Sequence, residues 1–190
     1  MNATESWITR ENQTPAEGAS GQQTETFDVV IVGGGPAGST AAEELARKGR
    51  SVLLLDRAGR VKPCGGAIPP RLIKDYRIPD NLLVARANAA RMVSPTTVNV
   101  DMPIEGGFVG MVDREHFDEW LRVRAADAGA IRRVGVFEKL ERDADGISRV
   151  HYRIRDRRVP GEGRLESVRA RAIIGACLLY TSPSPRDGLL

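Results

Sequence analysis

The stretch FDVVIVGGGPAGSTAAEELARKGRSVLLLD, residues 27–56, decides the fold of this chain. An apolar run, residues 29–32, is followed by a glycine-rich turn, a segment of helical periodicity ending near Gly49, and a second apolar run, residues 52–55. Short apolar runs bounded by turns are typical of buried strands, and apolar residues at intervals of three and four are typical of a helix. The stretch therefore predicts a strand, a turn, a helix and a second strand.

The spacing of the glycines in the turn indicates a site for a pyrophosphate. Gly33 allows the strand to end in a tight turn, Gly35 leaves no side chain between backbone and ligand, and Gly38 lets the helix lie close to the strand. Pro36 fits the first helical turn, where its missing N–H would have no intrahelical acceptor. The unpaired N–H groups and the positive end of the helix dipole attract an anion. We expect Gly33, Gly35, Pro36, Ala37 and Gly38 to bind a cofactor.

Asp56 ends the second predicted strand, where its carboxylate can accept hydrogen bonds from the 2′ and 3′ hydroxyl groups of a ribose. A carboxylate at this position would repel a 2′-phosphate, so the expected nucleotide is FAD or NAD rather than NADP. Glycine turns also serve plain strand-to-helix packing, and a structural βαβ unit is the alternative. Because strand, glycines, helix and acid occur in register within about 30 residues, the stretch favours nucleotide binding.

Composition excludes several classes of function. The chain has 190 residues, 41% hydrophobic and 5% aromatic, with a net charge of +3 and no run of like charge. These values predict a soluble protein and give no support to nucleic-acid binding. Cys64 and Cys177 have neither metal-ligand spacing nor a disulfide framework, which predicts no metal site and a reducing, cytoplasmic location. No apolar stretch reaches the length of a bilayer span.

Both ends of the chain differ in character from its middle. Residues 1–26 are polar, rich in Thr, Gln and Glu, and lack the apolar core of a secretory signal, so we expect a disordered tail. Residues 177–190 begin with CLLYTSPSPRD, which resembles the in-frame translation of a sequencing adapter. We expect the natural coding sequence to end at about Ala176, which would make this chain the amino-terminal part of a longer enzyme with a non-native tail.

The loop at residues 57–70 is dense in Gly and Pro and contains Lys62, Cys64, Gly65 and Gly66. Paired glycines indicate a sharp turn or a close approach of the backbone to a ligand. The loop is either a connector or a cofactor-facing segment, and in the second case Gly65 and Gly66 bind the cofactor.

Alternation and turn residues predict the elements beyond this loop. They are a short helix at 71–76, two strands within 90–104, a strand at 108–112, a helix that Asp113 caps and Gly129 ends, and strands at 134–140, 150–154 and 168–174. The last strand should return to the parallel sheet.

Charged side chains on the long helix and two histidines complete the candidates. Asp118 and Arg122 are spaced for an i, i+4 ion pair. Arg114 lies at the strand-to-helix junction, where it is either a surface residue or a ligand of a cofactor phosphate or ribose. His116 and His151 have no partner at a spacing typical of metal or triad chemistry, so we expect both to be structural.

Three motifs together resemble one family. VVIVGGGPAGSTAAEELARKG with its terminal Asp56, then DRAGRVKPCGGAIPPRLI, then GFVGMVDREHFDEWLR are similar to the geranylgeranyl reductases, flavoproteins of the glutathione-reductase-like fold. The resemblance implies an α/β fold, with residues 27–176 as the amino-terminal part of an FAD-binding Rossmann domain. It further implies an inserted antiparallel β region and an incomplete C-terminus. Family members continue after Gly-Ala with an Asp-Gly flavin-binding motif, whereas here Gly175-Ala176 is followed by Cys177.

The resemblance implies a reaction as well as a fold. NADPH would reduce FAD, and the reduced flavin would saturate double bonds of a geranylgeranyl group, carried on a free diphosphate or on a pigment ester. The enzyme would be cytoplasmic or peripheral to a photosynthetic membrane. Cys64 is the candidate catalytic residue as proton donor, and plain packing is its alternative role. A flavin monooxygenase or halogenase of the same fold, and a non-catalytic nucleotide-binding fragment, are the competing interpretations.

Overall fold

The computed structural model describes residues 24–57, 64, 66–154 and 163–177. The chain forms two compact units. We call Met1–Gly59 with Leu121–Leu190 the sheet unit, and Arg60–Trp120 the inserted unit. Lys62, Gly65, most of residues 1–26 and all but the first residue of 177–190 lie outside the described residues.

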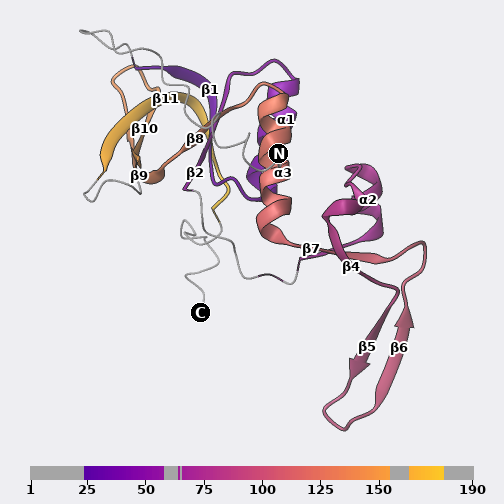
Figure 1. Ribbon diagram of the computed structural model, residues 1–190. Coiled ribbons are helices and arrows are strands. Elements are labelled where there is room, and N and C mark those ends of the chain that lie inside the picture. Colours follow the sequence, from indigo (N-terminus) through magenta and orange to yellow (C-terminus); the bar gives the residue numbers. More distant parts are fainter. Residues whose placement is uncertain (1–23, 58–63, 65, 155–162, 178–190) are drawn as a thin grey trace. The chain divides into compact units, whose positions relative to one another are not determined.

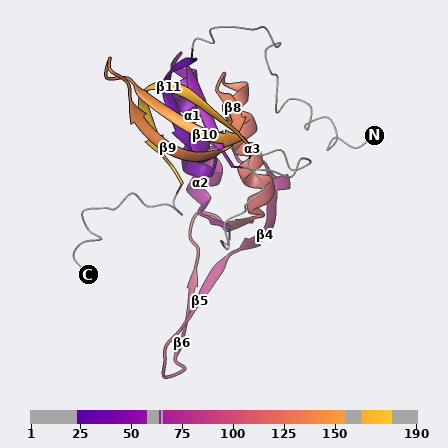
Figure 2. The same cartoon turned by 90° about the vertical axis from the view of Figure 1, so that its left-hand side faces the viewer.

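The sheet unit is built on a six-stranded sheet in the order β8-β2-β1-β11-β10-β9 (Figure 1). Strands β8, β2, β1 and β11 are parallel, and β10 and β9 continue the sheet in antiparallel fashion, side by side with β11 in Figure 2. The elements are β1 (Thr26–Val32), α1 (Pro36–Arg47), β2 (Val52–Asp56), β8 (Ile131–Val134), β9 (Val136–Arg142), β10 (Ser148–Ile154) and β11 (Arg164–Gly175). Helix α3 (Arg114–Asp127) begins in the inserted unit and ends in the sheet unit.

The core of the sheet unit lies on both faces of β1 and β2. Successive side chains of a strand point to opposite faces, and strands covered on both faces are apolar throughout. One face packs Phe27, Val30, Leu53, Leu55, Val150, Tyr152, Val168 and Ala170. The other packs Val29, Ile31, Val52, Leu54 and Ala130 against Ala42 of α1 and Ala125 of α3. This double burial explains why both strands are continuous apolar runs.

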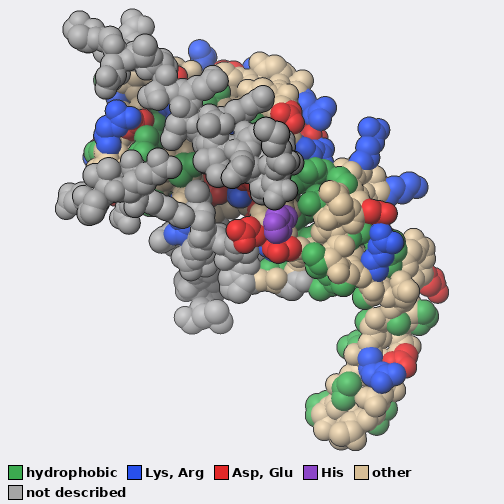
Figure 3. All heavy atoms as spheres, viewed as in Figure 1, with side chains coloured by type: hydrophobic (Ala, Val, Ile, Leu, Met, Phe, Trp, Pro, Cys, Tyr) green, Lys and Arg blue, Asp and Glu red, His purple; other side chains and the backbone are tan. Residues whose placement is uncertain are grey.

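The inserted unit contains two small antiparallel sheets, ordered β3-β7-β4 and β5-β6. Its elements are β3 (Ala67–Ile68), α2 (Pro70–Asp75), a 3-10 helix η2 (Asp80–Leu82), β4 (Leu83–Ala87), β5 (Ala89–Val93), β6 (Asn99–Pro103) and β7 (Val109–Val112). Met92, Val100 and Met102 of the β5–β6 hairpin are exposed, and apolar side chains can be followed along this ribbon in Figure 3.

Most of the predicted elements are confirmed. The strand, turn, helix and strand of residues 27–56 form as expected, the last strand pairs in parallel with β1, and the inserted region is antiparallel β structure. Strands β3 and β4 were not predicted, because β3 has two residues and β4, with the sequence LVARA, is short and has little alternation.

The prediction of one strand at 134–140 is wrong. The chain forms β8, parallel to β2, and then β9, antiparallel to β10, with Gly135 between them. The Gly135 N–H donates to the Asp56 carbonyl oxygen at 2.9 Å, and a Cβ on Gly135 would lie 2.7 Å from the Tyr152 ring. A glycine is therefore required at the point where the chain leaves its pairing with β2 and begins its pairing with β10. The pattern of polar and apolar residues does not change at Gly135, so the sequence does not reveal this point.

Candidate functional site

The glycine turn forms where β1 ends. Gly33 has φ of +114°, a conformation that side chains disfavour, and its N–H donates to the Leu55 carbonyl oxygen at 2.8 Å. A Cβ on Gly33 would lie 2.8 Å from the backbone of Ala176, because the end of β11 passes beside the turn. Only glycine fits at this position, and the turn is fixed to both neighbouring strands.

Gly38 brings α1 against the turn. A Cβ at this position would lie 1.8 Å from the Gly33 carbonyl oxygen, far inside contact distance. The helix therefore starts directly on the end of β1, as the glycine spacing predicted.

Gly35 and Pro36 begin α1 as the N-cap and the first helical residue. A Cβ on Gly35 would meet nothing within 4 Å, so this glycine is not required by packing within the described residues. Ala37, the next residue, is exposed, and the first turn of the helix carries no acidic side chain. The N-terminus of α1 thus offers backbone N–H groups and the positive end of the helix dipole to an anion, and Gly35, Pro36 and Ala37 fit a pyrophosphate.

Asp56 lies at the end of β2, beside the same turn, with 27% of its side chain exposed. Its Oδ1 accepts the Arg57 N–H at 2.9 Å, and its Oδ2 accepts from Arg122 Nη1 at 3.3 Å. The Asp56 side chain packs against Gly34, where a Cβ would lie 2.9 Å away. A carboxylate oxygen has more than one acceptor position, so Asp56 retains capacity for ribose hydroxyl groups.

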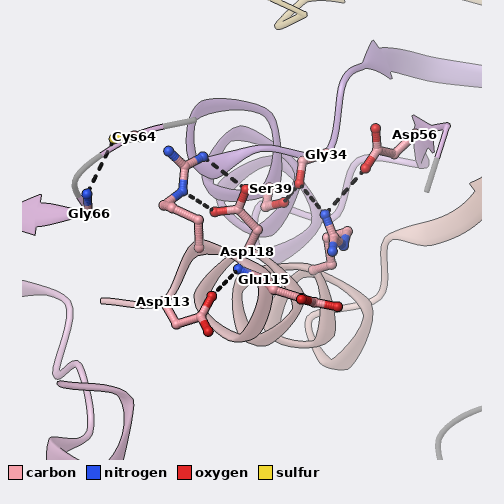
Figure 4. A network of polar contacts seen from close by, with 10 residues as sticks. Gly34, Ser39, Asp56, Cys64, Gly66, Asp113, Glu115 and Asp118 are labelled. Atoms are coloured by element: carbon pink, nitrogen blue, oxygen red, sulfur yellow. Dashed lines mark hydrogen bonds and ion pairs between the residues drawn. The ribbon is translucent and has the colours of Figure 1, made fainter. Parts of the chain in front are cut away.

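The predicted Asp118–Arg122 ion pair is wrong. Asp118 accepts both hydrogen bonds of a bidentate pair from Arg114, at 2.8 and 2.9 Å, and Arg122 reaches Gly34 and Asp56 instead (Figure 4). Arg114, Asp118 and Arg122 follow one another at intervals of four, so spacing alone allows Asp118 either partner. Arg122 is the site residue that sequence reasoning missed, because its partners lie 88 and 66 residues away.

Asp113 caps α3 as predicted, since its Oδ1 accepts the Glu115 N–H at 2.9 Å. Arg114, proposed as a cofactor ligand, is engaged by Asp118, and its side chain is 13% exposed.

Cys64, Gly66 and Arg114 come together within the inserted unit. The Gly66 N–H donates to Cys64 Sγ at 3.4 Å (Figure 4). This hydrogen bond, together with one from Arg114, lowers the pKa of the exposed thiol below its ordinary value. Gly66 has φ of +68°, and a Cβ there would lie 2.1 Å from the Val112 carbonyl oxygen. The sharp turn predicted for the paired glycines is thus present at Gly66, and the backbone that it closely approaches is that of Val112 in β7.

Each of the two histidines lies beside a carboxylate. His116 Nδ1 is 3.4 Å from Asp113, and His151 Nε2 is 2.7 Å from Glu141. Among the described residues, no group of His, Cys, Asp and Glu side chains has the arrangement of a metal site.

The model of one protein family, the pyridine nucleotide-disulphide oxidoreductases, matches residues 27–143, which include the glycine turn and Asp56. The chain belongs to this family. The family and the observed sheet together establish the α/β Rossmann-type fold expected from the sequence.

Among the relatives with named activities are geranylgeranyl diphosphate reductases. The chain is 66% identical over 118 residues to the geranylgeranyl diphosphate reductase of Rhodobacter capsulatus, a match that covers 62% of this chain and 30% of the reductase. The chain thus spans about a third of the length of the curated relatives it matches.

Solved structures agree on the fold. A geranylgeranyl bacteriochlorophyll reductase-like protein from Thermoplasma acidophilum is 27% identical with a TM-score of 0.63, covering 80% of this chain and 38% of that one. The flavin-dependent brominase Bmp2 has a TM-score of 0.66 at 22% identity, covering 80% and 38% of the two chains.

Within the described ranges, no helix combines the length and apolar character needed to cross a membrane.

Proposed function

We propose that this protein binds FAD and, as part of a complete enzyme, uses NADPH to saturate double bonds of a geranylgeranyl group. The observation that carries the proposal is the glycine turn with Asp56 beside it, in a chain 66% identical over 118 residues to a geranylgeranyl diphosphate reductase. The turn supplies the anion site, and the carboxylate supplies the ribose acceptor.

The roles of the sheet-unit residues follow from their positions. Gly33 and Gly38 hold the start of α1 against the end of β1, and Gly35, Pro36 and Ala37 present an open backbone to the pyrophosphate. Asp56 accepts the ribose hydroxyl groups. The specificity expected from this carboxylate concerns the nucleotide bound here, so it is compatible with NADPH reacting elsewhere on the enzyme.

The reduction needs a hydride and a proton. FAD, when bound and reduced, supplies the hydride to one alkene carbon, and a protein group must supply the proton to the other. Cys64 is the proposed proton donor, because its thiol is exposed and its lowered pKa makes it a stronger acid than an ordinary thiol. The thiolate formed would regain its proton from solvent, and the Gly66 N–H would stabilise it meanwhile.

The proposed cofactor ligands also include Gly65, Gly66 and Arg114. Gly66 and Arg114 already have partners in Val112 and Asp118, so cofactor binding would be a second role for each. Gly65 lies outside the described residues. The prenyl substrate would be a free diphosphate or a pigment ester, and the enzyme would be cytoplasmic or peripheral to a photosynthetic membrane.

Two measurements test the proposal. The purified chain should bind added FAD and acquire the visible flavin spectrum, whereas a chain that stays colourless with excess FAD contradicts the cofactor assignment. The full-length enzyme, given geranylgeranyl diphosphate and NADPH without oxygen, should release a prenyl product whose mass has increased by hydrogenation. Cys64→Ala in that enzyme should abolish the product while leaving FAD binding intact, and unchanged turnover would assign Cys64 to packing.

A flavin monooxygenase or halogenase is the second candidate, favoured by the likeness to the brominase fold. Such an enzyme requires oxygen, so product formation only in aerated samples would select it over the reductase. FAD binding without turnover by the full-length enzyme under either condition would select the non-catalytic nucleotide-binding interpretation.

A further inference from the structure

The carbonyl oxygen of Gly34 accepts two hydrogen bonds from side chains. Ser39 Oγ donates at 3.1 Å from within α1, and Arg122 Nη1 donates at 3.0 Å from α3 (Figure 4). Ser39 is fully buried, and the Arg122 side chain is 20% exposed. A carbonyl oxygen has two lone pairs, so these donors fill its capacity and fix the direction of the Gly34 carbonyl group.

Fixing this carbonyl also fixes the next N–H. The peptide between Gly34 and Gly35 is planar and trans, so its C=O and N–H point in opposite directions. Ser39 and Arg122 hold the carbonyl toward the protein, and the Gly35 N–H is therefore directed away from them. Gly35 is the N-cap of α1, with open space where a Cβ would be. Two side chains that need not touch a ligand thus orient a donor of the proposed pyrophosphate site.

The same nitrogen of Arg122 also meets the ribose acceptor. Nη1 lies 3.3 Å from Asp56 Oδ2 and 3.0 Å from the Gly34 oxygen, so a single atom joins the glycine turn to the carboxylate. The donor of both hydrogen bonds is a charged guanidinium group, and the side chains of Arg122 and Asp56 are only partly exposed. Arg122 thus links the glycine turn, which carries the phosphate donor, to the carboxylate proposed as the ribose acceptor.

We infer that Arg122 and Ser39 are positioning residues for the adenosine diphosphate half of FAD: Arg122 holds Gly34 and Asp56 in register, and Ser39 completes the grip on the Gly34 carbonyl. The inference rests on the proposed function, because it concerns the same cofactor site. It requires neither side chain to contact FAD.

FAD titration of the chain, followed by flavin fluorescence, tests the inference on Arg122→Met, Ser39→Ala and a matched control, Arg124→Met. Arg124 lies two residues along α3 with a similar exposure of 25%, and it donates to Glu43 at 2.7 Å. Glu43 keeps a second partner in Arg47, so Arg124→Met leaves no unpaired charge. We expect the dissociation constant of FAD to rise roughly tenfold in Arg122→Met, severalfold in Ser39→Ala and less than about twofold in Arg124→Met.

A double-mutant cycle separates positioning from general destabilisation. If Arg122 acts through Asp56, Asp56→Asn should weaken FAD binding by a smaller factor in the Arg122→Met background than in the wild type. Arg122→Lys keeps the charge and should recover part of the affinity. Thermal unfolding of Arg122→Met and Arg124→Met without FAD measures how much stability each variant loses, so that a loss of FAD affinity can be compared with it.

The outcomes are distinguishable from those for the proposed function. A wild-type chain that does not bind FAD overturns the proposed function and this inference with it. Wild-type binding, with Arg122→Met and Arg124→Met equal in FAD affinity, overturns the inference alone. A cycle in which the effects of Arg122→Met and Asp56→Asn simply multiply also overturns it.

Discussion

Replacement of Gly38 by alanine should change the free energy of unfolding through two opposing effects, a gain in helix propensity and a steric clash. Alanine favours a helix over glycine by about 1 kcal/mol, so propensity alone predicts stabilisation. The new Cβ, however, would lie 1.8 Å from the Gly33 carbonyl oxygen, and α1 would have to move away from the end of β1. Overpacking of this kind costs about 3 kcal/mol. The net loss of about 2 kcal/mol should lower the unfolding temperature by roughly 4–8 °C.

The matched control is Gly35→Ala. Its Cβ would meet nothing within 4 Å and its φ of −76° suits alanine, so the free energy of unfolding should change by less than about 1 kcal/mol. Its methyl group would instead separate the backbone from a phosphate, weakening FAD binding by about tenfold or more. Circular dichroism melts and FAD titrations of both variants measure the two effects. Equal stability of Gly38→Ala and wild type would refute the packing argument.

Three further outcomes are expected. In a Cys177→Ser background, the alkylation rate of Cys64 should rise at a lower pH than the alkylation rate of free cysteine, because hydrogen bonds from Gly66 and Arg114 lower the pKa of the Cys64 thiol. Arg114→Met should shift this rise to higher pH. An unchanged pH profile in Arg114→Met would contradict the contact between Arg114 and Cys64. Tyr152→Phe should reduce stability by about 1 kcal/mol in a denaturant melt, since the buried phenol, with its pKa raised to about 12, hydrogen-bonds Glu166 and Arg133. Arg91→Ala should change stability by less than about 0.5 kcal/mol, because its ion pair with Asp101 is exposed on both sides; a larger loss in the same melt would contradict this.

Sequence reasoning succeeded where the determinants are local. The turn from Gly33 to Gly38 depends on backbone conformation and on contacts between neighbours, which residue type and spacing express directly. It failed for Arg122, since three charges at intervals of four allow two pairings. It also failed at Gly135, where the chain passes from β8 to β9 without a change in polarity.

The sequence by itself determined that β1, the glycine turn, α1 and β2 form in that order with an acid at the end, because each step depends on residues within a few positions of one another. Only the tertiary structure decided what holds that assembly in register. Arg122 reaches Gly34 across 88 residues and Asp56 across 66, and such a contact exists only after α3 has packed on the sheet unit. Pairing over that separation depends on the geometry of the folded chain, which no local pattern encodes.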